Sequence, residues 1–186
     1  LASAPVKNTD RVGALLFTAG RERFGPPRKG FDHALSILRD VLVQPMEGTR
    51  TDLGLALKTA ASLLKQRSVV FVLSDFLAAD YEKPLKILRR RHDVVAMPIT
   101  DPLEAAIPDG GLVRLRDAET GLTRVFDAGD RAFRAAWKRR GRPFPDPAEV
   151  FRASGIDSVP LTTGAPYERA LVRFFKERER RRSAGR

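Results

Sequence analysis

The sequence predicts an α/β fold, a mostly parallel sheet with helices on both faces. Strand and helix patterns alternate over residues 11–99 in the order strand, helix, helix, strand, helix, strand. Residues 68–73, SVVFVL, are apolar at both alternating sets of positions, which is typical of a central parallel strand. Residues 110–128 then change the pattern, because LVRLRD and TRVF flank the turn residues AETG. We expect an inserted β-hairpin there.

The first elements follow from short periodic segments. RVGALLF at 11–17 predicts a buried strand, and 21–24 a short edge strand that ends before Pro26 and Pro27. A helix should begin after Gly30, because apolar residues then recur on one helical face. These residues are Phe31, Ala34, Leu35, Leu38, Val41 and Leu42.

The middle of the chain continues the alternation. A polar loop at 48–52 leads into a helix over 53–64, which Thr51 or Asp52 should cap through a side-chain oxygen. Residues 80–90 predict a helix with Tyr81 and its apolar neighbours facing inward. Residues 93–99 predict the next strand.

The last third predicts three more helices and one strand. Residues 130–140 form a basic helix with Trp137, and 147–154 a short helix after two prolines. The strand spans 156–161, and a basic closing helix spans about 166–182. With 186 residues, we expect one domain over 1–186.

Composition excludes several classes of protein. Hydrophobic residues make up 42% and charged residues 31%, as in globular proteins. The chain has no cysteine, which excludes disulfides and thiolate metal sites and suits the cytoplasm. No apolar run approaches the roughly 20 residues that span a bilayer. The first residue is Leu1, so we expect a processed product or a piece of a longer protein.

Positive charge is the strongest compositional signal. The chain has 34 Lys and Arg against 23 Asp and Glu, a net charge of +11. Seven basic and two acidic residues lie in 173–186. This end is either a solvated helix or a contact for an acidic protein, a nucleic acid or an anionic lipid, and net charge does not choose among them.

Common catalytic motifs are absent from the sequence. It contains no phosphate-binding P-loop, no dinucleotide fingerprint after a strand and no nucleophile elbow. His33 and His92 are far apart in the chain, and neither has a second histidine at metal-ligand spacing. We expect both histidines to be structural.

One oxygen-rich group of residues could bind a metal. Asp75 directly follows the strand at 68–73, and ligands of parallel α/β sheets bind beyond the carboxyl ends of strands. Thr51 and Asp52 lie in a loop that should open at the same edge. Their hydroxyl and carboxylates suit Mg²⁺, with Asp101 and Glu104 as outer partners. Asp75 alternatively serves only as a cap or solvated loop residue.

Several segments together resemble the bacterial "domain of unknown function 58" family, and the match covers nearly the whole chain in order. No single segment is specific by itself. The segments are NTDRVG at 8–13 with LLFT at 15–18, GTRTDLGLAL at 48–57, SVVFVLSDF at 68–76, RRRHDVV at 89–95, DPLE at 101–104, LVRLRDAETG at 112–121 and TTGAPYERALVRFF at 162–175.

The resemblance implies a von Willebrand factor A-like fold with a metal-ion-dependent adhesion site. Carried over by position, the site's threonine is Thr51 and its aspartate is Asp75. The D-x-S-x-S motif of the first strand has no counterpart here, and that strand would lie between 11–17 and 68–73. We therefore expect an N-terminally truncated domain whose metal site is incomplete in this chain.

The function that the resemblance implies is a non-enzymatic adaptor that works with a MoxR-type AAA+ ATPase. It would act in the cytoplasm or at the cytoplasmic face of a membrane. An alternative is nucleic-acid binding through the basic end and the basic residues of 131–142. A third is phosphoryl transfer with Asp75 as acceptor, but the strand end near Thr100 lacks the lysine that this chemistry expects.

Overall fold

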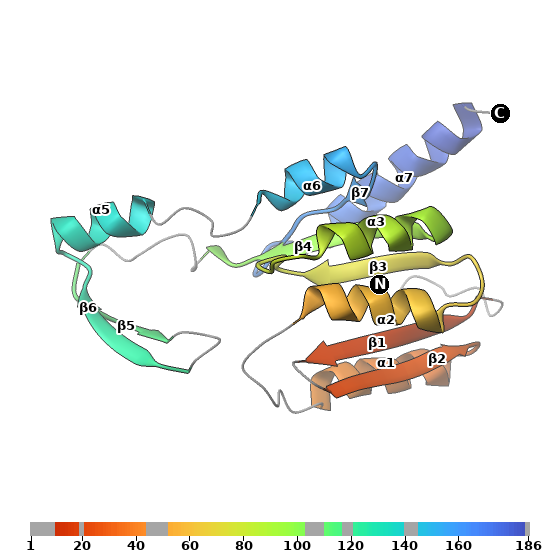
Figure 1. Cartoon of the computed structure of the whole chain (residues 1–186), viewed down its shortest axis with the longest axis horizontal. Coiled ribbons are helices and arrows are strands. Elements are labelled where there is room, and N and C mark those ends of the chain that lie inside the picture. Colours follow the sequence, from red (N-terminus) through yellow and green to blue (C-terminus); the bar gives the residue numbers. More distant parts are fainter. Residues whose placement is uncertain are drawn as a thin grey trace.

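A parallel sheet forms the centre of the computed structural model (Figure 1), which describes residues 10–18, 21–43, 52–102, 110–116, 121–139 and 145–184. Its strands are β3 (Val69–Ser74), β4 (Asp93–Thr100), β7 (Asp157–Ser158) and β8 (Leu161–Thr162). Strand β4 pairs in parallel with all three others. The predicted α/β class and its parallel core are confirmed.

Helices cover both faces of this sheet. On one face α2 (Leu53–Leu63), α3 (Glu82–Arg91) and α6 (Pro147–Ala153) pack on Val94 and Ala96 of β4. On the other face α7 (Glu168–Ala184) packs on Val95 and Met97. Successive side chains of a strand point to opposite faces, so β4 joins both cores, and these four residues are at most 1% exposed.

The N-terminal elements form a separate antiparallel pair. Strand β1 (Val12–Thr18) pairs with β2 (Arg21–Arg28), and α1 (Phe31–Val43) follows. Strand β2 is longer than the predicted 21–24, because it continues through both prolines. Proline lacks an N–H, so it fits an edge strand or a bulge, and the register shifts between Val12 and Ala14. At that shift a Cβ on Gly13 would lie 2.8 Å from the Gly25 carbonyl oxygen.

Strand β3 is an edge strand within the described residues. It pairs only with β4, whereas β1 pairs only with β2 (Figure 1). The sequence predicted a central strand covered on both faces. The middle fits, since the Phe71 ring lies 6.2 Å from that of Phe175, but Val69 and Leu73 are 51% and 54% exposed. No described strand pairs with the second edge of β3.

The apolar face of α1 is also largely open. The helix confirms the prediction after Gly30, but among its apolar residues only Ala34 is buried. Leu35 and Leu42 are 45% and 83% exposed. Helical periodicity therefore predicted the helix, while the described residues do not contain what would cover its stripe.

The predicted hairpin is present as β5 (Leu112–Arg116) and β6 (Thr123–Asp127). It projects away from the parallel sheet together with α5 (Arg131–Arg139) in Figure 1. The rings of Phe126 and Phe133 stack at 4.8 Å between centroids and form the core of this unit with Trp137. The change of pattern after residue 110 therefore marks a real change of structure.

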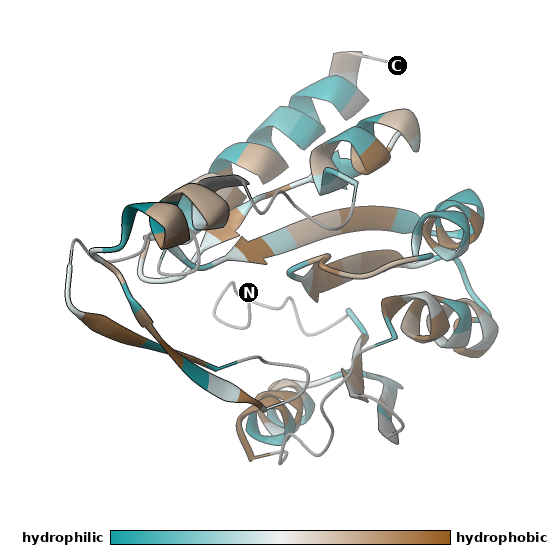
Figure 2. Ribbon diagram, turned by 60° about the vertical axis from the view of Figure 1, so that its left-hand side comes forward, coloured by the Kyte–Doolittle hydropathy of each residue, from teal (hydrophilic) through white to brown (hydrophobic). Residues whose placement is uncertain are grey.

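The C-terminal strand is shorter than predicted and split in two. Strand β7 pairs with Val95 and Ala96, and β8 with Ile99 and Thr100. Pro160, between them, has no N–H to donate, which interrupts the ladder. Figure 2 shows apolar residues concentrated on β3 and β4, and α7 largely hydrophilic. Within the described segments no helix is long and apolar enough to cross a membrane.

Candidate functional site

Asp75 lies at the carboxyl end of β3, where the strand turns towards α3. Its Oδ1 accepts a hydrogen bond from the Leu77 N–H at 3.0 Å. The preceding Ser74 Oγ accepts one from the Phe76 N–H, also at 3.0 Å. Side chains of Asp and Ser stabilise turns in this way. The Asp75 carboxylate is therefore exposed but held in place by its own turn.

The loop that carries Asp75 is anchored to the core by the residue that follows it, Phe76. Phe76 has a positive φ of 55° and Asp80 one of 57°, conformations that cost energy for residues with a side chain. Phe76 is fully buried, and its ring lies 5.5 Å from Tyr81 and 4.8 Å from Phe151. Burial of a phenylalanine contributes about 1.5–3 kcal/mol, of the same order as the strain of one such residue. Asp75 is therefore followed directly by a residue anchored in the core.

Asp52 lies at the N-terminus of α2, next to the same loop. Its Oδ1 accepts a hydrogen bond from the Leu55 N–H at 2.8 Å, so Asp52 is the cap that the sequence left open between two residues. A Cβ on Gly54 would lie 3.2 Å from the Asp80 carbonyl oxygen. The absence of a side chain thus lets the start of α2 pack directly on the 75–80 loop. Asp52 at the start of α2 and the 75–80 loop are therefore neighbours.

The other predicted site residues are placed only in part. Asp101 follows β4 directly and is half-buried, at the same edge of the sheet as Asp75. Thr51 and Glu104 lie outside the described residues. Among the described residues, no three His, Cys, Asp or Glu side chains gather closely enough to hold a metal ion. The magnesium site remains a prediction.

Tyr81 has a feature that sequence reasoning missed. The sequence predicted its ring to face inward, and it is 1% exposed. Its hydroxyl has no hydrogen-bond partner among the described residues. Burial raises the pKa of this hydroxyl, and the nearby charges of Glu82 and Asp146 raise it further. The signal in the sequence was a tyrosine, which carries a polar hydroxyl, at a position predicted to face inward.

The two histidines lie in other surroundings. His33 Nε2 is 3.0 Å from the Val12 carbonyl oxygen, which links α1 to β1. His92 precedes β4 at the opposite, amino edge of the sheet and is 2% exposed. Neither ring nitrogen of His92 is hydrogen-bonded within the described residues. Burial lowers the pKa of His92, and the Arg91 charge lowers it further.

These features define an α/β protein in which Asp52, Asp75 and Asp101 lie at the carboxyl edge of a parallel sheet. The chain belongs to the family described as "Protein of unknown function DUF58", whose model matches residues 1–143. This confirms the family that the sequence motifs indicated.

Mycobacterial proteins are similar to this chain over most of its length. It is 32% identical over 180 residues to Uncharacterized protein Mb1516 of Mycobacterium bovis and to Uncharacterized protein Rv1480 of Mycobacterium tuberculosis. The match covers 95% of this chain but only 56% of each relative. Uncharacterized protein MAV169 of Mycobacterium avium is 32% identical over 164 residues, which are 87% of this chain and 97% of that protein. No solved structure matches the chain.

Proposed function

We propose that this chain is the larger part of a von Willebrand factor A-like adaptor, which binds a protein partner through Mg²⁺ and carries out no catalysis. A MoxR-type AAA+ ATPase is the partner that we propose. Thr51 and Asp75 would be direct ligands, with Asp52, Asp101 and Glu104 around them. The observation that carries the proposal is the exposed Asp75 carboxylate on a loop that is anchored by buried Phe76 and packs against the start of α2.

The chemistry of the residues supports a hard cation at this edge. Mg²⁺ is usually held by one or two protein carboxylates, with water or ligand oxygens filling the other positions. The Oδ1 atom of Asp75 accepts the hydrogen bond of its turn, and the side chain is still exposed to solvent. An acidic side chain of a partner could complete the coordination. Binding of this kind needs neither a nucleophile nor a general base.

The open edge of β3 supports the proposed von Willebrand factor A-like fold. An open sheet edge leaves backbone N–H and C=O groups ready to pair with another strand, and the exposed Val69 and Leu73 add apolar surface to β3. A further strand between β1 and β3 would satisfy both edges. In our proposal that strand also brings the missing metal ligands.

The test is a calorimetric titration of Mg²⁺ into this chain and into a form extended upstream of Leu1. We expect binding only in the extended form, because only that form would hold the full set of oxygen ligands. Binding in neither form would remove the metal from the proposed function. Binding of equal strength in both would show that no further ligand is needed.

A single substitution tests the role of Asp75. In the extended form, Asp75→Ala should abolish Mg²⁺-dependent binding of the ATPase and leave the circular dichroism spectrum unchanged. Glu179→Ala is the matched control: it also removes one exposed carboxylate, but from the end of α7 near the amino edge of the sheet. Unchanged affinity in Asp75→Ala would contradict the adhesion-site proposal.

A further inference from the structure

The basic residues of α7 fall into two groups. Arg178 forms ion pairs with Asp93 and with Asp157, the latter at 3.1 Å, and its guanidinium lies over the Phe174 ring. Arg181 pairs with Asp157, also at 3.1 Å. Asp93 and Asp157 begin β4 and β7, so this group fastens the helix to the amino edge of the sheet.

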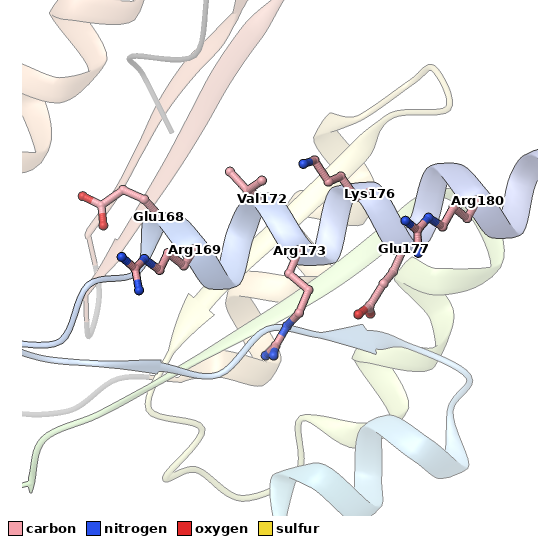
Figure 3. A pocket seen from close by; sticks show the side chains of 7 residues that line it. All are labelled: Glu168, Arg169, Val172, Arg173, Lys176, Glu177 and Arg180. Carbon is pink, nitrogen blue, oxygen red and sulfur yellow. The ribbon is translucent and has the colours of Figure 1, made fainter.

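The second group forms one stripe along the helix. Arg169, Arg173, Lys176 and Arg180 are spaced by four, three and four residues, which places them on one face. All four are exposed and, within the part of the chain that the structure describes, take part in no ion pair. We call them the cationic stripe. With Glu168, Val172 and Glu177 they line a shallow hollow of about 420 Å³ (Figure 3).

The cationic stripe takes no part in packing α7 on the sheet. The helix packs on the sheet through Leu171 and Phe174, on its other side. Like charges three and four residues apart destabilise a helix. Glu177 lies four residues after Arg173 and three before Arg180 and offsets part of this repulsion, and a negatively charged partner would offset the rest.

We propose that the cationic stripe binds an acidic segment of a protein partner. Glu168 and Glu177 lie in the same lining and would repel a phosphate backbone, whereas a protein can present basic residues to them. Val172 is 52% exposed between the charged side chains and offers an apolar contact. Arginine around an apolar centre is common at protein interfaces.

The aromatic residues of α7 also favour a protein over a nucleic acid. Single-stranded nucleic acids are usually held by stacking of bases on exposed rings. Phe174 is 8% exposed, and the Phe175 ring is 40% exposed but packs against Phe71 and Phe174. The cationic stripe itself contains no aromatic residue on which a base could stack. The cationic stripe contains no residue of the metal site, so this inference goes beyond the proposed function and does not depend on it.

The experiment measures fluorescence anisotropy at low ionic strength, where screening is weak. The probe is a labelled helical peptide whose glutamates follow the same four-three-four spacing. The variant is Arg173→Glu with Lys176→Glu. The control is Lys86→Glu with Arg90→Glu, an equal change of charge on exposed positions of α3 that form no ion pair within the described residues. Circular dichroism checks that both variants fold.

We expect the peptide to bind the wild type in a salt-dependent way, and the stripe variant to bind about tenfold more weakly. The control variant should bind nearly as the wild type does. Equal losses in both variants would overturn the proposal, because only net charge would then matter. The absence of peptide binding would also overturn it. So would tighter binding of a single-stranded or duplex oligonucleotide that the stripe variant abolishes, since it would assign the stripe to nucleic acid.

Discussion

At the scale of single residues, two acidic side chains at the carboxyl edge stabilise the local backbone. Asp52 and Asp75 each accept a hydrogen bond from a backbone N–H, at 2.8 and 3.0 Å. Such local bonds are what short carboxylates favour at helix starts and turns. A role in metal binding would therefore come in addition to a role in folding, and substitutions must separate the two.

Asp52→Ala should reduce stability because the first turn of α2 loses its cap. The expected loss in the free energy of unfolding is about 1 kcal/mol, measured by urea denaturation. Asp52→Asn keeps an acceptor oxygen and should retain most of the stability. An equal loss in both variants would mean that the negative charge, rather than the hydrogen bond, supports the helix.

His92 should make stability dependent on pH. Its folded-state pKa lies below the ordinary value of 6.5, so the unfolded chain takes up the proton first as pH falls. His92 therefore makes its whole contribution to the free energy of unfolding above pH 6.5. Below pH 6.5 that free energy decreases by at most about 1.4 kcal/mol per pH unit. Urea denaturation from pH 7.5 downwards measures it. His92→Gln should flatten the dependence, and an unchanged slope would assign it to other groups.

At the scale of elements, α7 shows how a helix can be amphipathic and also anchored by charge. Leu171 and Phe174 face the core, and Arg178 closes the end of that face against two strand starts. Its side chain is 15% exposed, against 61% for that of Arg181. Ion pairs protected from water are screened less than exposed ones.

Arg178→Ala should therefore be more costly than Arg181→Ala. The first removes the ion pairs that Arg178 forms with Asp93 and Asp157, and should lower the free energy of unfolding by about 1–3 kcal/mol. The second should cost less than about 1 kcal/mol. Thermal and urea denaturation of the two variants compare them directly. Equal costs would mean that the pairs on α7 contribute little beyond surface charge.

At the scale of the whole molecule, exposed apolar surface borders an open sheet edge. Val69 and Leu73 of β3 are half exposed, and apolar residues of α1 are exposed as well. Strand edges of this kind tend to pair with other chains. The described residues thus contain a core but do not enclose it completely.

We expect the isolated chain to associate in a concentration-dependent way, and Leu73→Lys to reduce that association, because a charge blunts an apolar edge. Analytical ultracentrifugation measures this. Leu112→Lys is the control, since Leu112 is 78% exposed but lies on the projecting hairpin. If Leu112→Lys reduced association equally, the edge of β3 would not be the specific site of association.

The sequence by itself determined the features that depend on local pattern. Periodicity predicted the helices and the parallel core strands, and the residues after β3 predicted where Asp75 would lie. These features follow from the spacing of apolar residues and from short-range caps and turns. The family could also be read from the order of the motifs, and the match over residues 1–143 confirms it.

The tertiary structure alone decided which segments pair and which charges are free. No local pattern shows that β1 pairs only with β2 among the described residues, or that β2 continues through its prolines. Nor does it show that Arg178 is paired while Arg173 is exposed and forms no ion pair within the described part of the chain. The physical reason is that strand pairing and ion pairing join residues far apart in the chain, so each choice depends on the packing of the whole molecule.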